Sequence, residues 1–253
     1  MKNIGVIIQT YNEFHQIEEC IRSAQLLTDT ISVIDTKSTD NTADKARDLG
    51  VSVLSFPFSR YVEPARKFGI INCNAEWVFI LDADERITKE LAQEIKEAVT
   101  TTKHTHFRVP RTNLFAGSFA LKHGGWAPDY QLRLIQKDAF VDWPARIHAT
   151  PEITGSEGRL QQKLLHYFHG DIEKMVQKTA VFEDIESDLL FKADKPVQTS
   201  TFFRKFFGEL YRRLGKGQAY RDGTVGIIEA LYQAFSKTIT YLYLYEKKER
   251  STH

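Results

Sequence analysis

The residues with the clearest capacity for chemistry are two carboxylates, Asp82 and Asp84, which follow the apolar run Trp77–Leu81. A short run that is apolar on both faces is typical of a strand buried in a sheet, so a strand is predicted over 77–84. Alternation along that strand places Asp82 and Asp84 on the same side. Two hard oxygen ligands suit Mg²⁺ or Mn²⁺ shared with a phosphate. The alternative is a solvated loop after a strand, because D-x-D is a common pattern.

The elements that must position these acids alternate along the N-terminal part of the chain. Apolar strand patterns occur at 4–8, 31–35, 51–55 and 77–84, and helix patterns at about 15–27, 42–49, 64–73 and 89–101. Further strands are predicted at Thr105–Pro110 and Gln131–Ile135, with an aromatic-rich connector over Arg111–Phe119. This order predicts an α/β fold with a doubly wound, Rossmann-like sheet that is mixed but mainly parallel.

Polar side chains follow the successive strands and are expected at the carboxyl edge of the sheet, where such folds bind ligands. They are Thr10, Glu13, Asp35, Asp40, Asp82 and Asp84. The chain has neither G-x-G-x-x-G after the first strand nor G-x-x-x-x-G-K-[ST], which disfavours dinucleotide and P-loop enzymes. Because the chain has acids at this edge but no glycine-rich phosphate loop, we expect a metal ion to bind the phosphate groups of the ligand.

Composition excludes several classes of protein. The 253 residues carry a formal net charge of +1, so no overall nucleic-acid-binding charge is present. Cys20 and Cys73 lack metal-type spacing and imply no disulfide framework, which indicates a reducing compartment. No signal-peptide pattern and no apolar stretch of about 20 residues is seen, so a cytoplasmic location is expected.

Three motifs in order resemble family 2 glycosyltransferases of the GT-A fold: Val6–Glu13, Val33–Thr42 and Ile80–Glu85. The resemblance implies an inverting enzyme that uses a nucleotide-sugar donor and a divalent cation. His123–Leu134 and Leu164–Tyr167 are similar to the branch of bacterial lipopolysaccharide or lipooligosaccharide core β-1,4-glucosyltransferases. That branch implies UDP-glucose as donor and the inner-core heptose as acceptor.

Carried onto this sequence, the resemblance implies roles on the donor side. Thr10, Tyr11 and Glu13 would hold the uridine, and Asp35 the uracil or ribose. The alternative for Thr10 and Glu13 is that they only form the turn and cap the following helix. Lys37 stands where the branch usually has a small residue, so the turn there is expected to differ.

The diphosphate and the metal involve a further set of residues. Arg66 is expected to reach the pyrophosphate, or else to lie on a solvated helix face. Asp82 would contact ribose or metal, and Asp84 would ligate the metal, Mn²⁺ or Mg²⁺. His166 is a candidate third ligand, which would give a His-Asp-Asp set suited to Mn²⁺. His169 is a second, less favoured candidate for this third metal ligand.

Asp129 is the candidate general base, because an inverting transfer needs one carboxylate, apart from the metal pair, to take the acceptor hydroxyl's proton. The alternative is a turn residue that pairs with Arg133. The candidate acceptor-binding residues are Trp126, Arg133 and His148. Trp126 beside two glycines can stack on a sugar, but a core aromatic is as ordinary. His148 precedes alanine where the branch tends to have Glu, and a core histidine is its alternative.

Two domains are predicted, a catalytic domain over 1–170 and a helical region over 171–253. Within the latter, Thr201–Lys216 interleaves aromatic with basic residues, which is typical of an interfacial helix at an anionic membrane. The alternative is a packed helix with a basic outer face. Gly223–Tyr245 is a second apolar and aromatic helix that could instead support a homodimer.

The sequence thus predicts a metal-dependent inverting glycosyltransferase. It would act on a lipid-linked saccharide at the cytoplasmic face of a bacterial inner membrane. Alternatives are a related enzyme that acts on another cell-envelope polysaccharide and a catalytically impaired nucleotide-binding scaffold at the membrane. A nucleotidyltransferase or metal phosphohydrolase would want a basic or glycine-rich phosphate loop, and Gln9–Glu13 is not one.

Overall fold

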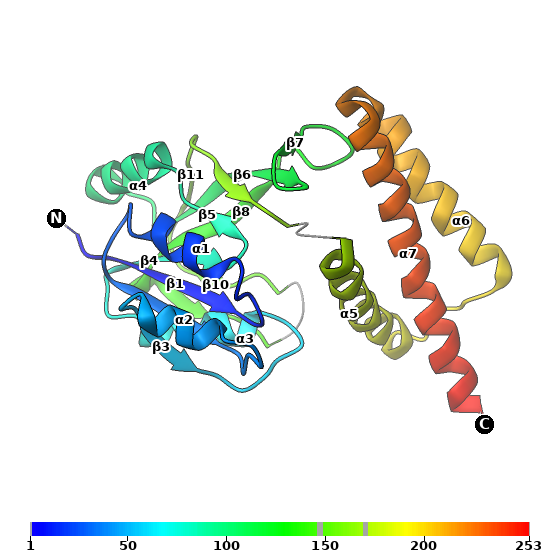
Figure 1. Ribbon diagram of the computed structural model, residues 1–253, viewed down its shortest axis with the longest axis horizontal. Helices are drawn as coiled ribbons and strands as arrows, with labels where there is room; N and C mark the ends of the chain where they lie inside the picture. The colour runs from blue at the N-terminus through cyan, green and yellow to red at the C-terminus, as the bar shows by residue number, and fades with distance from the viewer. Residues whose placement is uncertain (1, 146–148, 169–171, 253) are drawn as a thin grey trace. The chain divides into compact units, whose positions relative to one another are not determined.

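The computed structural model describes residues 2–145, 149–168 and 172–252. Two compact units divide the chain: a sheet unit, Met1–Thr112 with Asp129–His166, and a helical unit, Asn113–Pro128 with Tyr167–His253. In the sheet unit, the parallel strands lie in the order β3-β2-β1-β4 (Figure 1). Their bounds are β1 Ile4–Thr10, β2 Ile31–Asp35, β3 Ser52–Ser55 and β4 Trp77–Asp82.

Antiparallel strands extend this sheet beyond β4, in the order β8-β6-β12-β5. Their bounds are β5 Glu85–Arg86, β6 His106–Phe115, β8 Tyr130–Gln136 and β12 Leu164–His166. Two further short strands, β7 Phe119–Leu121 and β11 Glu157–Arg159, each pair with β6. Strands β9 Phe140–Asp142 and β10 Glu152–Ile153 form a separate two-stranded sheet. The predicted α/β fold, with a doubly wound sheet that is mixed and mainly parallel, is confirmed.

Helices cover both faces of the parallel strands, which explains why those strands are apolar throughout. Val6 and Ile8 of β1 pack in one cluster with α1 Ile17–Ala24 and α4 Lys89–Thr101. Ile7 points the other way and packs with Ile70 of α3 Glu63–Asn72. The remaining helix between strands is α2 Thr42–Asp48, and a 3₁₀ turn, η1, spans Lys137–Ala139.

Two predicted strands have different bounds in the structure. The strand predicted over 77–84 ends at Asp82, and Ala83 and Asp84 form a turn, so strand alternation does not orient Asp84. The strand predicted to end at Pro110 continues as β6 to Phe115, through half of the predicted connector. Proline donates no amide hydrogen bond, yet Pro110 lies opposite Tyr130 in the β6–β8 register.

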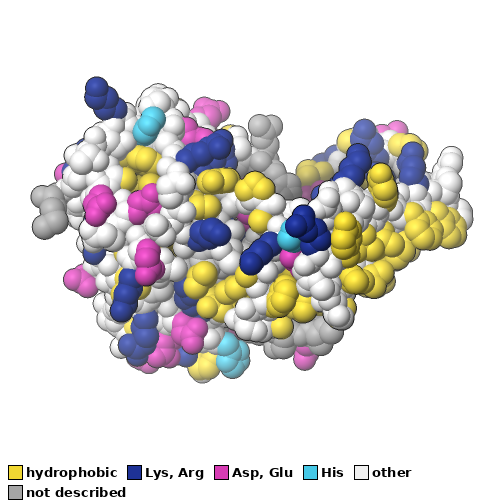
Figure 2. All heavy atoms as spheres, turned by 90° about the horizontal axis from the view of Figure 1, so that it is seen from above, with side chains coloured by type: hydrophobic (Ala, Val, Ile, Leu, Met, Phe, Trp, Pro, Cys, Tyr) yellow, Lys and Arg dark blue, Asp and Glu magenta, His cyan; other side chains and the backbone are white. Residues whose placement is uncertain are grey.

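The helical unit contains α5 Ile172–Lys192, α6 Thr199–Leu210 and α7 Gly223–Thr252. A π-helical segment, η2 Tyr211–Lys216, continues α6, and a 3₁₀ turn, η3 Ala219–Asp222, precedes α7. Hydrophobic side chains gather on the surface of these helices (Figure 2). None of the helices within the described ranges is long and apolar enough to span a bilayer.

Candidate active site

Asp82 ends β4 at the carboxyl edge of the sheet, where two arginines hold its carboxylate. Arg66 Nη2 lies 2.7 Å from Oδ1 and 2.8 Å from Oδ2 of Asp82. Arg133 Nη2 donates to Oδ2 of Asp82 over 2.6 Å. Burial alone would raise the pKa of the Asp82 carboxyl, but Arg133 and Arg66 more than offset this and hold that pKa well below its usual range.

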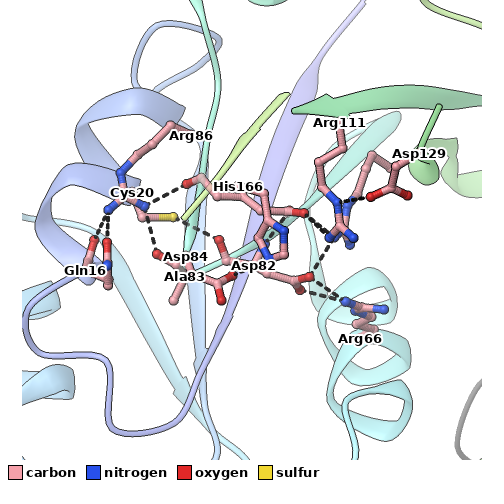
Figure 3. A network of polar contacts seen from close by, with 12 residues as sticks. Gln16, Cys20, Arg66, Asp82, Ala83, Asp84, Arg86, Arg111, Asp129 and His166 are labelled. Atoms are coloured by element: carbon pink, nitrogen blue, oxygen red, sulfur yellow. Dashed lines mark hydrogen bonds and ion pairs between the residues drawn. The ribbon is translucent and has the colours of Figure 1, made fainter. Parts of the chain in front are cut away.

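Each arginine comes from a different element, and packing explains its position. Arg66 projects from α3 toward Asp82 (Figure 3). The helix can lie close to the sheet because it carries Gly69 there: a Cβ at this position would be 2.8 Å from Cδ1 of Ile7. Arg133 is buried on β8, which pairs with β4 in antiparallel orientation.

Glu85 and Arg111 complete a chain of alternating charges that the sequence analysis missed. The fully buried Glu85 accepts from Arg133 over 2.6 Å and from Arg111 over 3.2 Å. Arg111 Nε in turn lies 2.8 Å from Oδ2 of Asp129, the candidate base. The position of Glu85 directly after the two aspartates was a signal for its role, whereas Arg111 fell in a segment predicted to be a connector.

Asp129 is therefore fixed from two sides. Its Oδ1 accepts a 2.6 Å hydrogen bond from Gln131, and its backbone carbonyl accepts one of 2.7 Å from the amide of Arg111. The alternative pairing of Asp129 with Arg133 is not found, since Arg133 binds Asp82 and Glu85. The predicted acceptor role of Arg133 would have to operate from this buried position.

Asp84 and His166 form the second feature of the site. His166 Nε2 lies 3.7 Å from Oδ1 of Asp84, and both side chains are mostly buried. The antiparallel pairing of β12 with β5, which sets His166 opposite Glu85, brings the histidine to the turn that carries Asp84. Figure 3 shows His166, Asp84 and Asp82 together at the centre of the polar network.

Asp84 and His166 carry donor atoms of the types that bind divalent metals. One carboxylate and one imidazole suit Mn²⁺ and leave coordination positions for phosphate oxygens. Among the residues that the structure describes, no group of three or more His, Cys, Asp or Glu side chains could hold a metal alone. Asp82 has both oxygens engaged by arginines, so its predicted part in the metal set stays a prediction, as does the Mg²⁺ alternative.

The predicted uridine residues lie side by side at the ends of β1 and β2, where Thr10 is in register with Asp35. Both are buried, and neither Oγ1 of Thr10 nor Oδ1 of Asp35 has a hydrogen-bond partner within the described chain. Buried polar atoms are rarely left unsatisfied, so these two oxygens point to a polar ligand at this position.

The turn after β1 carries the other two donor candidates. Glu13 takes part in this turn: its amide donates to Oγ1 of Thr42 over 2.9 Å, and its carbonyl accepts from the amides of Gln16 and Ile17, each over 2.9 Å. The N-cap residue of α1 is Gln16. Tyr11 is exposed and its ring lies 4.9 Å from that of Phe58. In the turn after β2, Lys37 has φ = 67°, a left-handed conformation that few side chains favour.

The remaining acceptor candidates are Trp126 and His148. Trp126 belongs to the helical unit, where its ring centroid lies 4.5 Å from that of Phe168, with the two rings tilted by 35°. The guanidinium carbon of Arg213 lies 5.3 Å from the Trp126 ring centroid. His148 and His169 lie outside the described residues. Their predicted roles stay predictions.

The sequence is similar to known glycosyltransferases along most of its length. An uncharacterized glycosyltransferase of Rickettsia prowazekii is 24% identical over 250 residues, which cover 94% of this chain and 85% of the relative. The lipopolysaccharide core biosynthesis glycosyltransferase LpsC of Rhizobium meliloti is 25% identical over 260 residues, covering 96% and 92%. Both names describe transferases of sugars.

Solved structures share the fold. A mycobacterial protein superposes with a TM-score of 0.52 at 14% identity, covering 78% of this chain and 76% of the other. Glucosyl-3-phosphoglycerate synthase from Mycobacterium tuberculosis, in complex with Mn²⁺, UDP and glucosyl-3-phosphoglycerate, reaches 0.50 at 15% identity, covering 78% and 82%. The family model of glycosyl transferase family 2 matches residues 5–147, more than half of the sequence. The chain is therefore a glycosyltransferase that belongs to glycosyl transferase family 2.

Proposed function

We propose that this enzyme transfers a hexose, with inversion, from a nucleotide sugar to a lipopolysaccharide-core type acceptor, and that it depends on a divalent metal. The proposed donor is UDP-glucose and the proposed acceptor hydroxyl belongs to an inner-core heptose. The proposal divides the chain into a catalytic part, 1–170, and a helical part, 171–253, that meets the cytoplasmic face of the bacterial inner membrane. The observation that carries it is the Asp84–His166 pair beside the arginine-bound Asp82.

The donor side follows from the sheet edge. Thr10 and Asp35 offer unsatisfied buried oxygens for the polar edges of a nucleoside, and Tyr11 and Glu13 border them in sequence. Asp84 and His166 would hold Mn²⁺ or Mg²⁺, which supplies charge stabilisation for a leaving diphosphate. Arg66, which already binds one anion, Asp82, is the cation placed to exchange that contact for a phosphate.

Asp129 is the proposed general base. It would take the proton of the acceptor hydroxyl as that oxygen attacks the sugar carbon from the side opposite the leaving diphosphate. Arg111 and Gln131 hold its carboxylate in one orientation, as a base that must meet one hydroxyl requires. Trp126, Arg133 and His148 remain the proposed acceptor contacts.

The acceptor class is inferred from similarity to LpsC, whose name states lipopolysaccharide core biosynthesis and which aligns with 96% of this chain. A donor such as UDP-glucose is consistent with the fold, because glucosyl-3-phosphoglycerate synthase was solved with Mn²⁺ and UDP. A different envelope saccharide as acceptor is the second candidate, since the Rickettsia relatives are named only as glycosyltransferases.

The test is a transfer assay on a panel of donors and acceptors, with product masses read by mass spectrometry. UDP-glucose with a deacylated core oligosaccharide should give a product one hexose heavier when Mn²⁺ or Mg²⁺ is present, and none in excess EDTA. In parallel, UDP should raise the melting temperature only with metal. The variant Asp84→Asn should strongly weaken both signals, while Asp44→Asn, an exposed carboxylate on α2, should keep them. A folded wild type that binds UDP but transfers no hexose to any acceptor would favour the scaffold alternative, and one that binds no nucleotide would overturn the proposed function.

A further inference from the structure

Helix α6 presents a stripe of aromatic side chains to solvent. Phe203, Phe207 and Tyr211 recur every four residues, which places them on one helix face, and they are 62%, 59% and 65% exposed. Large apolar side chains this exposed, and this close together, normally mark a surface that meets a partner or a membrane.

Basic side chains lie beside this stripe. Arg204 and Arg212 each follow an aromatic residue of the stripe by one position, and Lys216 continues the same exposed row after η2 begins. Gly208 lies in the same row, between Arg204 and Arg212. No atom from the rest of the described chain lies within 4 Å of a Cβ built at Gly208, so the surface at this position is uncovered. An aromatic row next to a cationic row is the arrangement of helices that lie in the interface of an anionic bilayer.

The acidic side chains of this region are turned inward. Between Thr199 and Lys237 the chain has seven Lys or Arg and only three Asp or Glu. Asp222 and Glu229 are buried, and Glu209 is mostly buried and bound by Arg212 and Arg213. The charge that this segment shows to its surroundings is therefore almost entirely positive.

Helix α7 adds an apolar row of its own. Ile228, Leu231 and Phe235 are exposed and follow each other at three- and four-residue steps. The other faces of α7 are occupied: Ser236 donates to Glu183 of α5 over 2.5 Å, and Lys205 of α6 lies 4.9 Å from the ring centroid of Tyr241. Figure 2 shows the resulting band of hydrophobic side chains on the helical unit, with Lys and Arg side chains beside it.

The exposed face of α6, η2 and the first half of α7 is called the membrane face below. We propose that it docks on a bilayer that contains anionic phospholipids. The aromatic and aliphatic side chains would enter the headgroup region while Arg204, Arg212 and Lys216 meet lipid phosphates. A second copy of the chain is the weaker candidate, because two faces with the same positive charge repel each other. The inference extends the proposed function, since a lipid-linked acceptor lies in such a surface.

Vesicle flotation of the full-length protein, without donor or acceptor, tests the inference independently of catalysis. Vesicles of phosphatidylcholine with phosphatidylglycerol should carry the protein, and vesicles of phosphatidylcholine alone should carry much less. Added NaCl should weaken the binding by screening. Each neutralisation, Arg204→Gln, Arg212→Gln or Lys216→Gln, should weaken it about fivefold. The double variant Phe203→Ser with Phe207→Ser should remove most of it.

Matched controls separate this face from general surface effects. Arg250→Gln, near the end of α7, and Val181→Ser, an exposed apolar residue of α5, should float like the wild type. Circular dichroism would verify that each variant is folded. No flotation of the wild type, or equal flotation of the wild type and the Phe203/Phe207 variant, would overturn the proposal. A dimer seen by analytical ultracentrifugation that this variant disrupts, with no vesicle binding, would assign the face to a second copy instead.

Discussion

Arg133 Nη2 lies 2.6 Å from Oδ2 of Asp82, across the antiparallel junction between β4 and β8. This contact, with that of Arg66, converts the first aspartate of the D-x-D motif into part of an ion-pair network. The second aspartate, Asp84, faces His166 instead. The two acids of one short motif therefore have different surroundings, and their substitution should have different consequences.

The variant Asp82→Asn should destabilise the protein by about 2–3 kcal/mol at neutral pH. Breaking a buried ion pair costs about 3–5 kcal/mol, and the lower value reflects the partial exposure of Asp82 and the second acid, Glu85, that Arg133 keeps. Urea unfolding of both proteins measures the difference.

The pH dependence of that difference follows from the lowered pKa of Asp82. A carboxyl whose pKa is lowered on folding contributes its full stability above the unfolded-state pKa of about 4, and loses it as the pH falls through the folded-state value. The gap between wild type and Asp82→Asn should thus be constant from about pH 8 to pH 5 and shrink below about pH 4. A gap that widens in acid would contradict the assignment.

The variants Asp84→Asn and His166→Ala should weaken metal binding, whereas they should leave the ion pairs of Asp82 with Arg66 and Arg133 intact. Each removes one of the two proposed protein ligands, so turnover should fall by about 10²–10³ and the Mn²⁺ concentration for half-maximal activity should rise. Activity measured across a Mn²⁺ titration checks both effects. Asp82→Asn serves as the comparison, and an unchanged Mn²⁺ requirement in Asp84→Asn would refute the proposed metal ligands.

The elements that carry the site could be predicted from the sequence where their patterns are local. The bounds of β2 and α4 agree with the prediction, because the patterns are local and Thr88 caps α4, its Oγ1 accepting from the amide of Leu91. Acids at the carboxyl edge follow from parallel strand order, which alternation of strands and helices reveals.

The partners of those acids could not be predicted. Which arginine meets which carboxylate depends on the register of β8, β6 and β12, which are distant in sequence and antiparallel. A shift by one residue would have pointed Arg133 to the other face. The sequence therefore singled out Asp82 and Asp129 as candidates but did not identify Glu85 and Arg111, which, with Arg133, connect these two aspartates.

The variant Asp129→Asn should lower turnover by about 10²–10⁴ while leaving donor affinity and folding nearly intact. An amide of the same shape can still accept from Arg111 but cannot take up a proton. Steady-state kinetics under saturating donor, with UDP-dependent thermal shifts on the same protein, measure the two properties. Asp138→Asn, an exposed carboxylate in η1, is the matched control. Wild-type turnover in Asp129→Asn would assign the base to another residue.

The variant Gly69→Ala tests whether close packing of α3 positions Arg66. The added Cβ would lie 2.8 Å from Cδ1 of Ile7 and 3.1 Å from Cγ1 of Ile34, both fully buried on the sheet, so either these side chains or the helix must shift. Overpacking of this kind costs about 1–3 kcal/mol, more than the gain of up to about 1 kcal/mol from replacing a helical glycine.

We therefore expect Gly69→Ala to melt at a lower temperature and to bind UDP more weakly, because Arg66 sits one turn earlier on the same face of α3. Gly208→Ala on α6 is the matched substitution, where the new methyl group meets open space, and it should stabilise its helix by about 0.5–1 kcal/mol. Differential scanning fluorimetry with and without UDP and Mn²⁺ measures both variants. Gly69→Ala could instead stabilise the protein and leave UDP binding unchanged. That result would show that a methyl group fits between α3 and the sheet, and that close packing of α3 does not position Arg66 beside Asp82.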